Sequence, residues 1–207
     1  MQQVAVVTFD GFNELDSFIA SALINRCRAD GLEALITTPT PVVTSMNGVE
    51  VRGQRSMEFV AQADVVLIGS GIATREVVAD DELIGGLRAR LDPQRQLIGS
   101  QCSGALVLAR LGLVGDGVPA CTDMTSRPFV EACGVTVLDE PFYAQGDVAT
   151  AGGCLASQYL AAWVITRTLG LEVARGVLAY VAPVGEGSTT VNRVLGTVAR
   201  AGAYALG

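Results

Sequence analysis

Cys102 stands in a stretch of this sequence whose pattern suits covalent chemistry. The segment QLIGSQCSGALVLARLG, residues 96–112, runs from an apolar strand-like piece through Cys102 into a helix-like piece. Ser100 and Gly104 lie two residues to either side, and a nucleophile elbow needs such small neighbours because its strained backbone projects the nucleophile into a cleft. The helix that follows would direct its positive end at the sulfur and favour the thiolate. Cys102 is therefore predicted to be a nucleophile.

Asp16 is the first candidate for the group that exchanges a proton with Cys102. The chain contains no histidine, which is the usual partner of a catalytic cysteine. Asp16 lies early in the first predicted helix, directly after the first predicted strand, and so at the same edge of a parallel sheet as Cys102. A carboxylic acid partly removed from water has a raised pKa and can hold a proton near neutral pH. The residue types alone leave a second interpretation open, in which Asp16 and Glu14 only complement the positive end of the helix.

The other four cysteines are widely scattered along the chain: Cys27, Cys121, Cys133 and Cys154. A free cysteine in a reducing compartment is usually a small buried apolar side chain, and we expect this of most of them. Cys121 and Cys154 lie near strand ends, and either could be a resolving thiol, although packing is the favoured interpretation. There is no CxxC pair and no histidine, so no metal site is predicted.

Thr122 and Asp123 follow a predicted strand at 118–121 and are candidates to line the same cleft. The carboxylate of Asp123 also suits the N-cap of the following helix, and this is the favoured role of an aspartate at such a position. The chain contains neither GxxxxGK[ST] nor GxGxxG, so the sequence predicts no nucleotide site.

The apolar pattern predicts strands and helices in alternation. Continuous apolar runs that end at glycine or polar residues are typical of strands buried on both faces of a parallel sheet, and they occur at 4–9, 33–37, 64–70 and 96–100. Helical patterns cover 13–30, 80–91 and 103–112. Asn13 and Asp80 are expected N-caps, and Gly31 is an expected C-cap residue.

The segment 38–53 interrupts this alternation. Its two β-prone pieces flank Asn47-Gly48, a type I′ turn signature, which predicts a β-hairpin at the sheet edge. Beyond the strand at 118–121, the expected elements are a helix near 125–133, strands at 135–138 and 147–150, and a helix at 155–169. We therefore expect a single domain over residues 1–207 with an α/β flavodoxin-like fold, in which helices cover both faces of a doubly wound, mostly parallel sheet.

The composition limits the partners of this 207-residue chain. A formal net charge of −7 argues against nucleic-acid binding, which requires a dense positive surface. The beginning, MQQVAVVTFD, has no basic flank and is too short an apolar run for a signal peptide or a membrane span. A cytoplasmic protein without a membrane partner is expected. The apolar end of the chain, 191–207, is interpreted as a surface or interface helix.

These motifs resemble the ThiJ/PfpI superfamily, which has the class I glutamine amidotransferase-like fold. The similar segments are FDGFNELD (9–16), LIGSG (67–71), SQCSGALVLARLGLV (100–114) and ATAGGCLASQYLAAWVI (149–165). Within the superfamily the pattern is most similar to the isonitrile (isocyanide) hydratase branch and to related domains fused to transcription activators. The resemblance implies a homodimer with the cleft near its interface.

The resemblance also implies a role for each matching position. Cys102 matches the nucleophile, and Asp16 matches an acidic partner placed for proton transfer. Gly71 and Ile72 match a turn whose backbone N–H groups would face the sulfur and form an anion pocket. Ser103 stands where the hydratases commonly have threonine, so a hydroxyl is kept there.

An isonitrile hydratase-like enzyme is the favoured function. Cys102 would add to the terminal carbon of an isocyanide, a small electrophile, to give a thioimidate, and Asp16 would deliver a proton and position the water that releases an N-substituted formamide. This chemistry requires no metal and no cofactor. Two alternatives stay open: glyoxalase- or deglycase-like activity on small 2-oxoaldehydes, and a non-enzymatic redox sensor based on Cys102. The segment 120–128 lacks the histidine base of many peptidase-like and glyoxalase-like members. Its absence weighs against peptidase activity and against glyoxalase-like activity.

Overall fold

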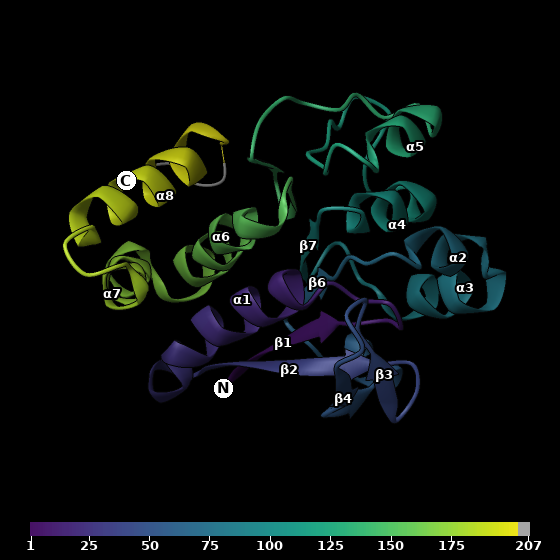
Figure 1. Ribbon diagram of the computed structural model, residues 1–207, viewed down its shortest axis with the longest axis horizontal. Helices are drawn as coiled ribbons and strands as arrows, with labels where there is room; N and C mark the ends of the chain where they lie inside the picture. The colour runs from purple at the N-terminus through teal and green to yellow at the C-terminus, as the bar shows by residue number, and fades with distance from the viewer. Residues whose placement is uncertain (203–207) are drawn as a thin grey trace.

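The computed structural model (Figure 1) describes residues 1–202. It centres on a seven-stranded sheet in the order β5-β2-β1-β6-β7-β9-β8. Neighbouring strands are parallel except β8 and β9, which are antiparallel. The strands are β1 (Gln2–Val7), β2 (Leu32–Thr38), β3 (Val42–Thr44), β4 (Glu50–Arg52), β5 (Arg55–Ser56), β6 (Val65–Ile68), β7 (Leu97–Gln101), β8 (Phe142–Gln145) and β9 (Val148–Ala151). The α-helices are α1 (Glu14–Ile24), α2 (Thr74–Ala79), α3 (Asp81–Arg90), α4 (Gly104–Leu111), α5 (Arg127–Ala132), α6 (Ser157–Leu169), α7 (Leu171–Val181) and α8 (Gly187–Arg200). Three short 3₁₀ helices are η1 (Asn25–Asp30), η2 (Met57–Ala61) and η3 (Cys154–Ala156).

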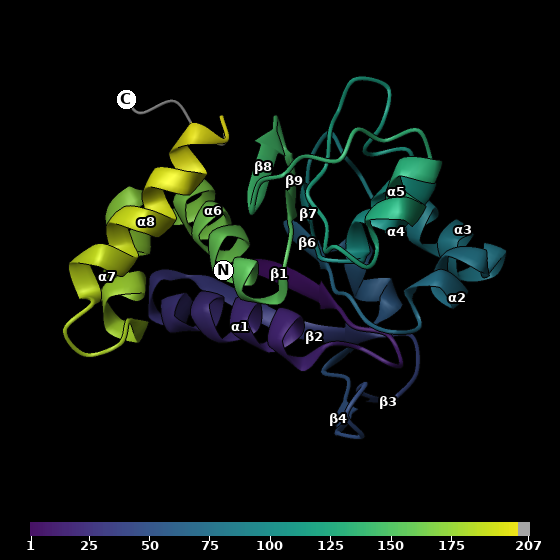
Figure 2. The same ribbon diagram turned by 45° about the horizontal axis from the view of Figure 1, so that its top comes forward.

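Helices cover both faces of the sheet, as the doubly wound prediction requires. Figure 2 shows α1, α6, α7 and α8 on one side and α2, α3, α4 and α5 on the other. Alternate residues of β1 supply the two cores, with Val4 and Val6 in one and Ala5 and Val7 in the other. Side chains alternate between faces along a strand, so a strand covered twice must be apolar throughout. The predicted fold class is confirmed.

The predicted caps are confirmed, whereas some helix boundaries were wrong. Asn13 accepts a hydrogen bond from the Leu15 amide, and Asp80 caps α3 in the same way. Gly31 has a φ of 93°, the left-handed conformation that glycine adopts most easily. The helix predicted over 13–30 is α-helical only to Ile24 and continues as η1. The sequence interpretation did not include α2 or α7, which have no side-chain N-cap hydrogen bond.

The hairpin predicted at 38–53 is present, but its turn differs from the prediction. β3 and β4 pair antiparallel as a separate two-stranded sheet, which Figure 2 shows near β2. Gly48 has a φ of 85°, whereas Asn47 does not have the positive φ that a type I′ turn requires. The connection is a longer loop in which the Ser45 hydroxyl accepts hydrogen bonds from the amides of Asn47 and Val49. The side chain of Ser45 thus organises the loop.

Two predicted strands on the far side of the sheet were wrong. The segments 118–121 and 135–138 make isolated bridges and no strand: Ala120 pairs with Val137, and Val118 pairs with Gly115. Pro119 lacks an N–H group, so the first segment cannot form a full ladder. The strand predicted at 147–150 is β9, and its partner β8 was not predicted.

Near the end of the described chain, α8 covers Gly187–Arg200, whereas 203–207 of the predicted terminal helix lie outside the described residues. Within residues 1–202, no helix is long and apolar enough to cross a membrane.

Candidate active site

Cys102 occupies a sharp turn between β7 and α4. It has a φ of 45°, in the left-handed region that non-glycine residues rarely adopt. Its amide donates to the carbonyl oxygen of Ala151 at 2.8 Å, and its carbonyl oxygen accepts from the Thr122 hydroxyl at 2.8 Å. Hydrogen bonds on both sides of the residue therefore hold the strained conformation, which is the backbone geometry that the elbow pattern predicted.

Gly104 explains why the elbow needs a small residue two positions after the cysteine. A Cβ atom at Gly104 would lie 2.8 Å from the carbonyl oxygens of Ile68 and Gly69. These backbone atoms belong to the end of β6 and the turn after it, so α4 can begin against β6 only without a side chain there. The close approach fixes where the first turn of α4 lies relative to Cys102.

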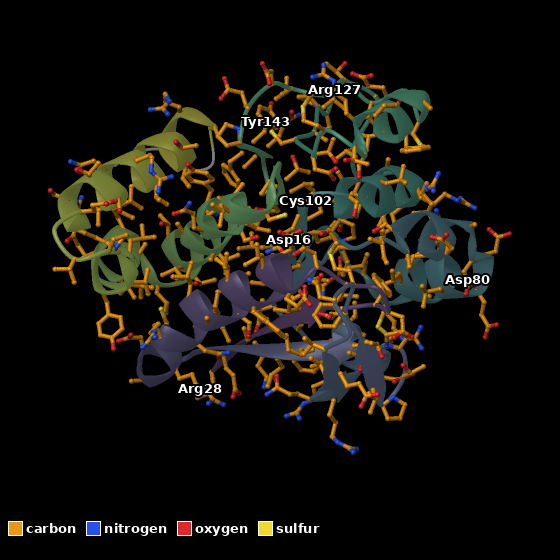
Figure 3. The ribbon with its side chains drawn as sticks, viewed as in Figure 1. Asp16, Arg28, Asp80, Cys102, Arg127 and Tyr143 are labelled. Carbon is orange, nitrogen blue, oxygen red and sulfur yellow. The ribbon has the colours of Figure 1, made fainter. Side chains whose placement is uncertain are left out.

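Asp16 lies in the first turn of α1 and is completely buried. One carboxylate oxygen accepts a hydrogen bond from Ser70, and the other accepts from Ser157 at 3.3 Å. A carboxylate oxygen of Asp16 and the Cys102 sulfur lie within 4.8 Å of each other. Figure 3 shows both side chains at the centre of the molecule, where the start of α1 meets the elbow. The structure thus brings together the two residues predicted to exchange a proton.

Burial and the neighbouring carboxylate determine the protonation of this pair. Burial raises the pKa of Asp16, although hydrogen bonds from Ser70, Cys102 and Ser157 lower it. Burial, followed by the charge of Asp16, raises the pKa of the Cys102 thiol. The sequence interpretation expected the helix dipole to favour the thiolate, whereas the pKa of this thiol is raised, with burial as the largest cause. Ionisation of either group therefore opposes ionisation of the other.

Cys154 is a third member of the cluster, whereas the sequence interpretation favoured packing for it and offered a resolving thiol at Cys121 or Cys154 as the alternative. Its sulfur lies within 4.8 Å of both the Cys102 sulfur and a carboxylate oxygen of Asp16. The Asn13 side-chain amide donates to it at 3.0 Å. Two sulfurs and an oxygen at these separations could also hold a soft or borderline metal ion, although the sequence predicted no metal site. The only sequence signal was the location of Cys154 near a strand end.

A cavity of about 590 Å³ opens onto this cluster. Its lining includes Cys102 and Cys154, and also four other residues predicted from the sequence: Gly71, Ile72, Ser103 and Asp123. Thr122 does not line this cavity; it supports the elbow and faces a separate one of about 510 Å³, which Asp123 also lines.

The amides predicted to form an anion pocket already have partners. The Gly71 amide donates to the Ser103 hydroxyl at 3.1 Å, and the Ile72 amide donates to the Gly11 carbonyl at 2.9 Å. The expectation that both amides face the sulfur freely is therefore corrected, because the turn uses them to pack against its neighbours. Within residues 1–202, the amides of Ser103 and Gly104 have no hydrogen-bond acceptor, as is usual for a first helical turn.

Two further predicted residues have structural contacts at the rim. The Ser103 hydroxyl lies 2.7 Å from the Thr74 hydroxyl, which ties the elbow to the start of α2. One carboxylate oxygen of Asp123 accepts from the amides of Thr125 and Ser126, so it caps the turn that leads into α5. The capping interpretation of Asp123 agrees with these bonds.

Comparison with known proteins gives one family and many similar folds. A sequence model of the DJ-1/PfpI family matches residues 2–167. Comparison with curated proteins gives no match at a significant level. Similar solved structures include Schizosaccharomyces pombe DJ-1, with a TM-score of 0.75 and 16% identity over 87% of this chain and 99% of that chain. A THiJ/PfpI family protein from Pseudomonas syringae has a TM-score of 0.75 and 18% identity over 97% and 90% of the two chains.

A third similar structure is an AraC family transcriptional regulator from Pseudomonas putida, with a TM-score of 0.72 and 18% identity over 88% of this chain and all of that chain. At such low identities the structures show the fold alone. The family match covers most of the chain, including the segments that carry Asp16, Cys102 and Cys154. The chain therefore belongs to the DJ-1/PfpI family.

Proposed function

We propose that this protein hydrates an isocyanide to an N-substituted formamide, with Cys102 as the nucleophile. The observation that carries the proposal is the fully buried Asp16 carboxyl beside the Cys102 sulfur in a chain without histidine. A cysteine with a carboxyl partner suits an addition reaction, in which no amine leaving group has to be protonated. The terminal carbon of an isocyanide accepts a sulfur nucleophile and then needs one proton.

The shared proton of the pair serves both halves of the reaction. As the Cys102 sulfur bonds to the isocyanide carbon, Asp16 receives the thiol proton and then delivers it to that carbon, which gives a thioimidate. Water next adds to the same carbon, and the nitrogen takes up a proton. Collapse of the adduct breaks the carbon–sulfur bond, releases the formamide and returns the proton to the pair. One substrate and one water are consumed, and the enzyme is regenerated.

Polar groups around the pair support these steps. Ser70 and Ser157 hold the two oxygens of Asp16, which fixes the carboxyl toward the cluster. We assign the oxygen that water contributes to the amides of Ser103 and Gly104, which follow the nucleophile and have no acceptor within residues 1–202. Ser103 thus keeps its proposed place in substrate binding, through its backbone.

The cavity lining fits a small uncharged substrate. Apolar side chains from four segments line it, namely Met46, Ile72, Leu106 and Phe129. Arg75 also lines the cavity, with its guanidinium 4.8 Å from the centre of the Phe129 ring. Gly71 and Ile72 contribute here as wall residues. We propose that the substituent on the isocyanide nitrogen contacts this apolar wall.

Formamide production from a simple aromatic isocyanide tests the proposal. We expect the purified protein to form the N-aryl formamide, and Cys102→Ala to lower the rate by at least about a thousandfold. Cys121→Ala, which removes another buried thiol, should retain most of the activity. An unchanged isocyanide would overturn the proposal, and lactate formation from methylglyoxal in its place would assign the nucleophile to 2-oxoaldehyde chemistry.

We further propose that the protein is a cytoplasmic homodimer that does not bind nucleic acid. Ile72, Met124 and Leu155 are large apolar side chains, each at least 65% exposed, on segments that adjoin Cys102 or the two cavities beside it. We propose that these side chains are buried against a second copy of the chain. The net charge of −7 opposes nucleic-acid binding. Light scattering should give twice the chain mass, and Leu155→Glu should reduce it; a monomeric wild type would contradict the dimer.

A further inference from the structure

Cys154 carries features that packing alone does not explain. Its sulfur lines the same cavity as Cys102 and is within 4.8 Å of the Cys102 sulfur. It is partly exposed, whereas Cys27 and Cys121 are completely buried. A second thiol beside a nucleophilic cysteine, reached from one cavity, is the arrangement that resolves an oxidised cysteine.

The Asn13 side chain is oriented toward Cys154 by the helix that it caps. Its oxygen accepts from the Leu15 amide, so its nitrogen must point the other way, and it donates to the Cys154 sulfur at 3.0 Å. An N–H donor stabilises the negative charge that an attacking sulfur carries. The start of α1 therefore supplies Asp16 to one cysteine and Asn13 to the other.

We propose that Cys154 resolves a peroxide-oxidised Cys102 by closing a reversible Cys102–Cys154 disulfide. The oxidant is a hydroperoxide small enough to enter the cavity. The proposal does not depend on isocyanide hydration, because it uses only the two sulfurs and their neighbours.

The proposed reaction proceeds in two steps. In the first, the Cys102 sulfur attacks the outer oxygen of the hydroperoxide, a sulfur–oxygen bond forms and the oxygen–oxygen bond breaks. The alcohol or water that leaves takes up the proton shared with Asp16, and Cys102 becomes a sulfenic acid. In the second, the Cys154 sulfur attacks the Cys102 sulfur, and the hydroxyl leaves as water with the Cys154 proton. The peroxide is reduced by two electrons, and the two thiols supply them.

The local backbone indicates which sulfur has to move. A disulfide bond is about 2.05 Å long, so the sulfurs must approach each other. Cys102 is held at both its amide and its carbonyl oxygen, by Ala151 and Thr122, whereas Cys154 is held at its carbonyl oxygen by Ser157 and follows Gly153, where an added Cβ would meet no atom within 4 Å. Cys154 therefore rotates toward Cys102 and gives up its bond to Asn13. The loss of that bond favours reopening once a reducing thiol is present.

Peptide mapping after peroxide treatment tests the disulfide. Cleavage after arginine and glutamate places Cys102 in 96–110 and Cys154 in 132–167, because the bond before Pro141 resists cleavage, and fragment ions of the linked peptide distinguish Cys154 from Cys133. With equimolar hydrogen peroxide, we expect these two peptides to be linked, lighter by two hydrogens, and separated again by dithiothreitol. In Cys154→Ser the linked product should be absent, and sulfinic acid at Cys102 should accumulate about tenfold faster. Cys121→Ala serves as the matched control and should behave as the wild type.

Asn13→Asp provides a second test that keeps the helix cap. The aspartate retains an oxygen for the Leu15 amide but replaces the donor at Cys154 with a second acceptor. We expect slower disulfide closure, with more sulfenic and sulfinic acid at Cys102, in a protein that still folds. Two results would overturn the proposal: sulfinic acid formation in the wild type as fast as in Cys154→Ser, or a wild-type Cys102 that peroxide leaves unmodified.

Discussion

Cys102 and Cys121 are two buried cysteines whose backbone amides form hydrogen bonds with neighbouring residues of β9. The amide of Cys102 donates to the Ala151 carbonyl and the amide of Cys121 to the Thr150 hydroxyl, each at 2.8 Å. Burial raises the pKa of both thiols, to about 12 for Cys121. The two residues are alike in their burial, in the strand that anchors them and in the direction in which burial moves the pKa.

The difference between them is the partner and the backbone. Cys102 lies beside a buried carboxyl and has a strained φ of 45°, whereas within residues 1–202 Cys121 has no carboxylate within hydrogen-bond distance and no positive φ. Burial by itself produces an inert thiol, because it only stabilises the protonated form. Beside Cys102, the Asp16 carboxyl can accept the proton of the thiol, so this thiol can react although it is buried. The comparison therefore makes Asp16, more than the elbow, the residue that separates the two sites.

The largest expected effect is the loss of activity in Asp16→Asn. An amide cannot take up the thiol proton, so we expect the rate of formamide production to fall by about 10²–10⁴-fold. Asp123→Asn is the matched control, because it lines the same cavity and an asparagine keeps the oxygen that caps the turn before α5. It should lose less than about tenfold. Equal losses in the two variants, measured at saturating isocyanide, would remove the distinction between Cys102 and Cys121.

The elbow could be predicted because its determinants are close in sequence. Ser100, Cys102 and Gly104 lie within five residues, and the apolar run before them and the helix after them specify the turn. The caps at Asn13 and Asp80 were predicted for the same reason. By contrast, the pairing of Asp16 with Cys102 joins distant segments, and the residue types alone left a helix-capping role for Asp16 open.

The parts that could not be predicted depend on packing between segments. The contact of Cys154 with Asn13 brings together the turn after β9 and the start of α1, and nothing near Cys154 in sequence indicates it. The amides of Gly71 and Ile72 are used by Ser103 and Gly11, which only the packed turn reveals. The predicted direction of the change in the Cys102 pKa was wrong because the helix was visible in the sequence and the depth of burial was not.

The second prediction concerns the elbow that holds Cys102 and compares the two ends of α4. In Gly104→Ala the new Cβ would lie 2.8 Å from two backbone oxygens, which cannot move cheaply, so we expect the free energy of unfolding to fall by about 3 kcal/mol. Gly112→Ala places a Cβ in open space at a φ of 79° and should cost about 1 kcal/mol. Urea denaturation measures both. A smaller loss for Gly104→Ala than for Gly112→Ala would show that the close approach to β6 does not constrain the elbow.

The smallest expected effect is the pH dependence that Asp16 gives to stability. Burial raises the pKa of Asp16 above its ordinary value of 3.8, so the folded protein keeps a proton that the unfolded chain has lost. The stability from this proton is complete below pH 3.8 and is lost as the pH rises through the folded pKa. Asparagine does not titrate, so Asp16→Asn should gain stability relative to the wild type as the pH rises from about 4 to about 7. The gain is about 1.4 kcal/mol for each pH unit by which the folded pKa exceeds the unfolded one.

The thermal midpoint of unfolding, measured at several pH values, gives the stability of Asp16→Asn relative to the wild type. Asp123→Asn is the control for the loss of another carboxylate near Cys102. A midpoint of Asp16→Asn that falls relative to the wild type as the pH rises would mean that the folded protein stabilises the carboxylate. In that case the hydrogen bonds from Ser70 and Ser157 would outweigh burial, and Asp16 would release its proton more readily than the proposed chemistry requires. The direction in which the relative stability of Asp16→Asn changes with pH therefore decides whether Asp16 holds a proton beside Cys102. Such a proton is what would distinguish the Cys102 site from the Cys121 site.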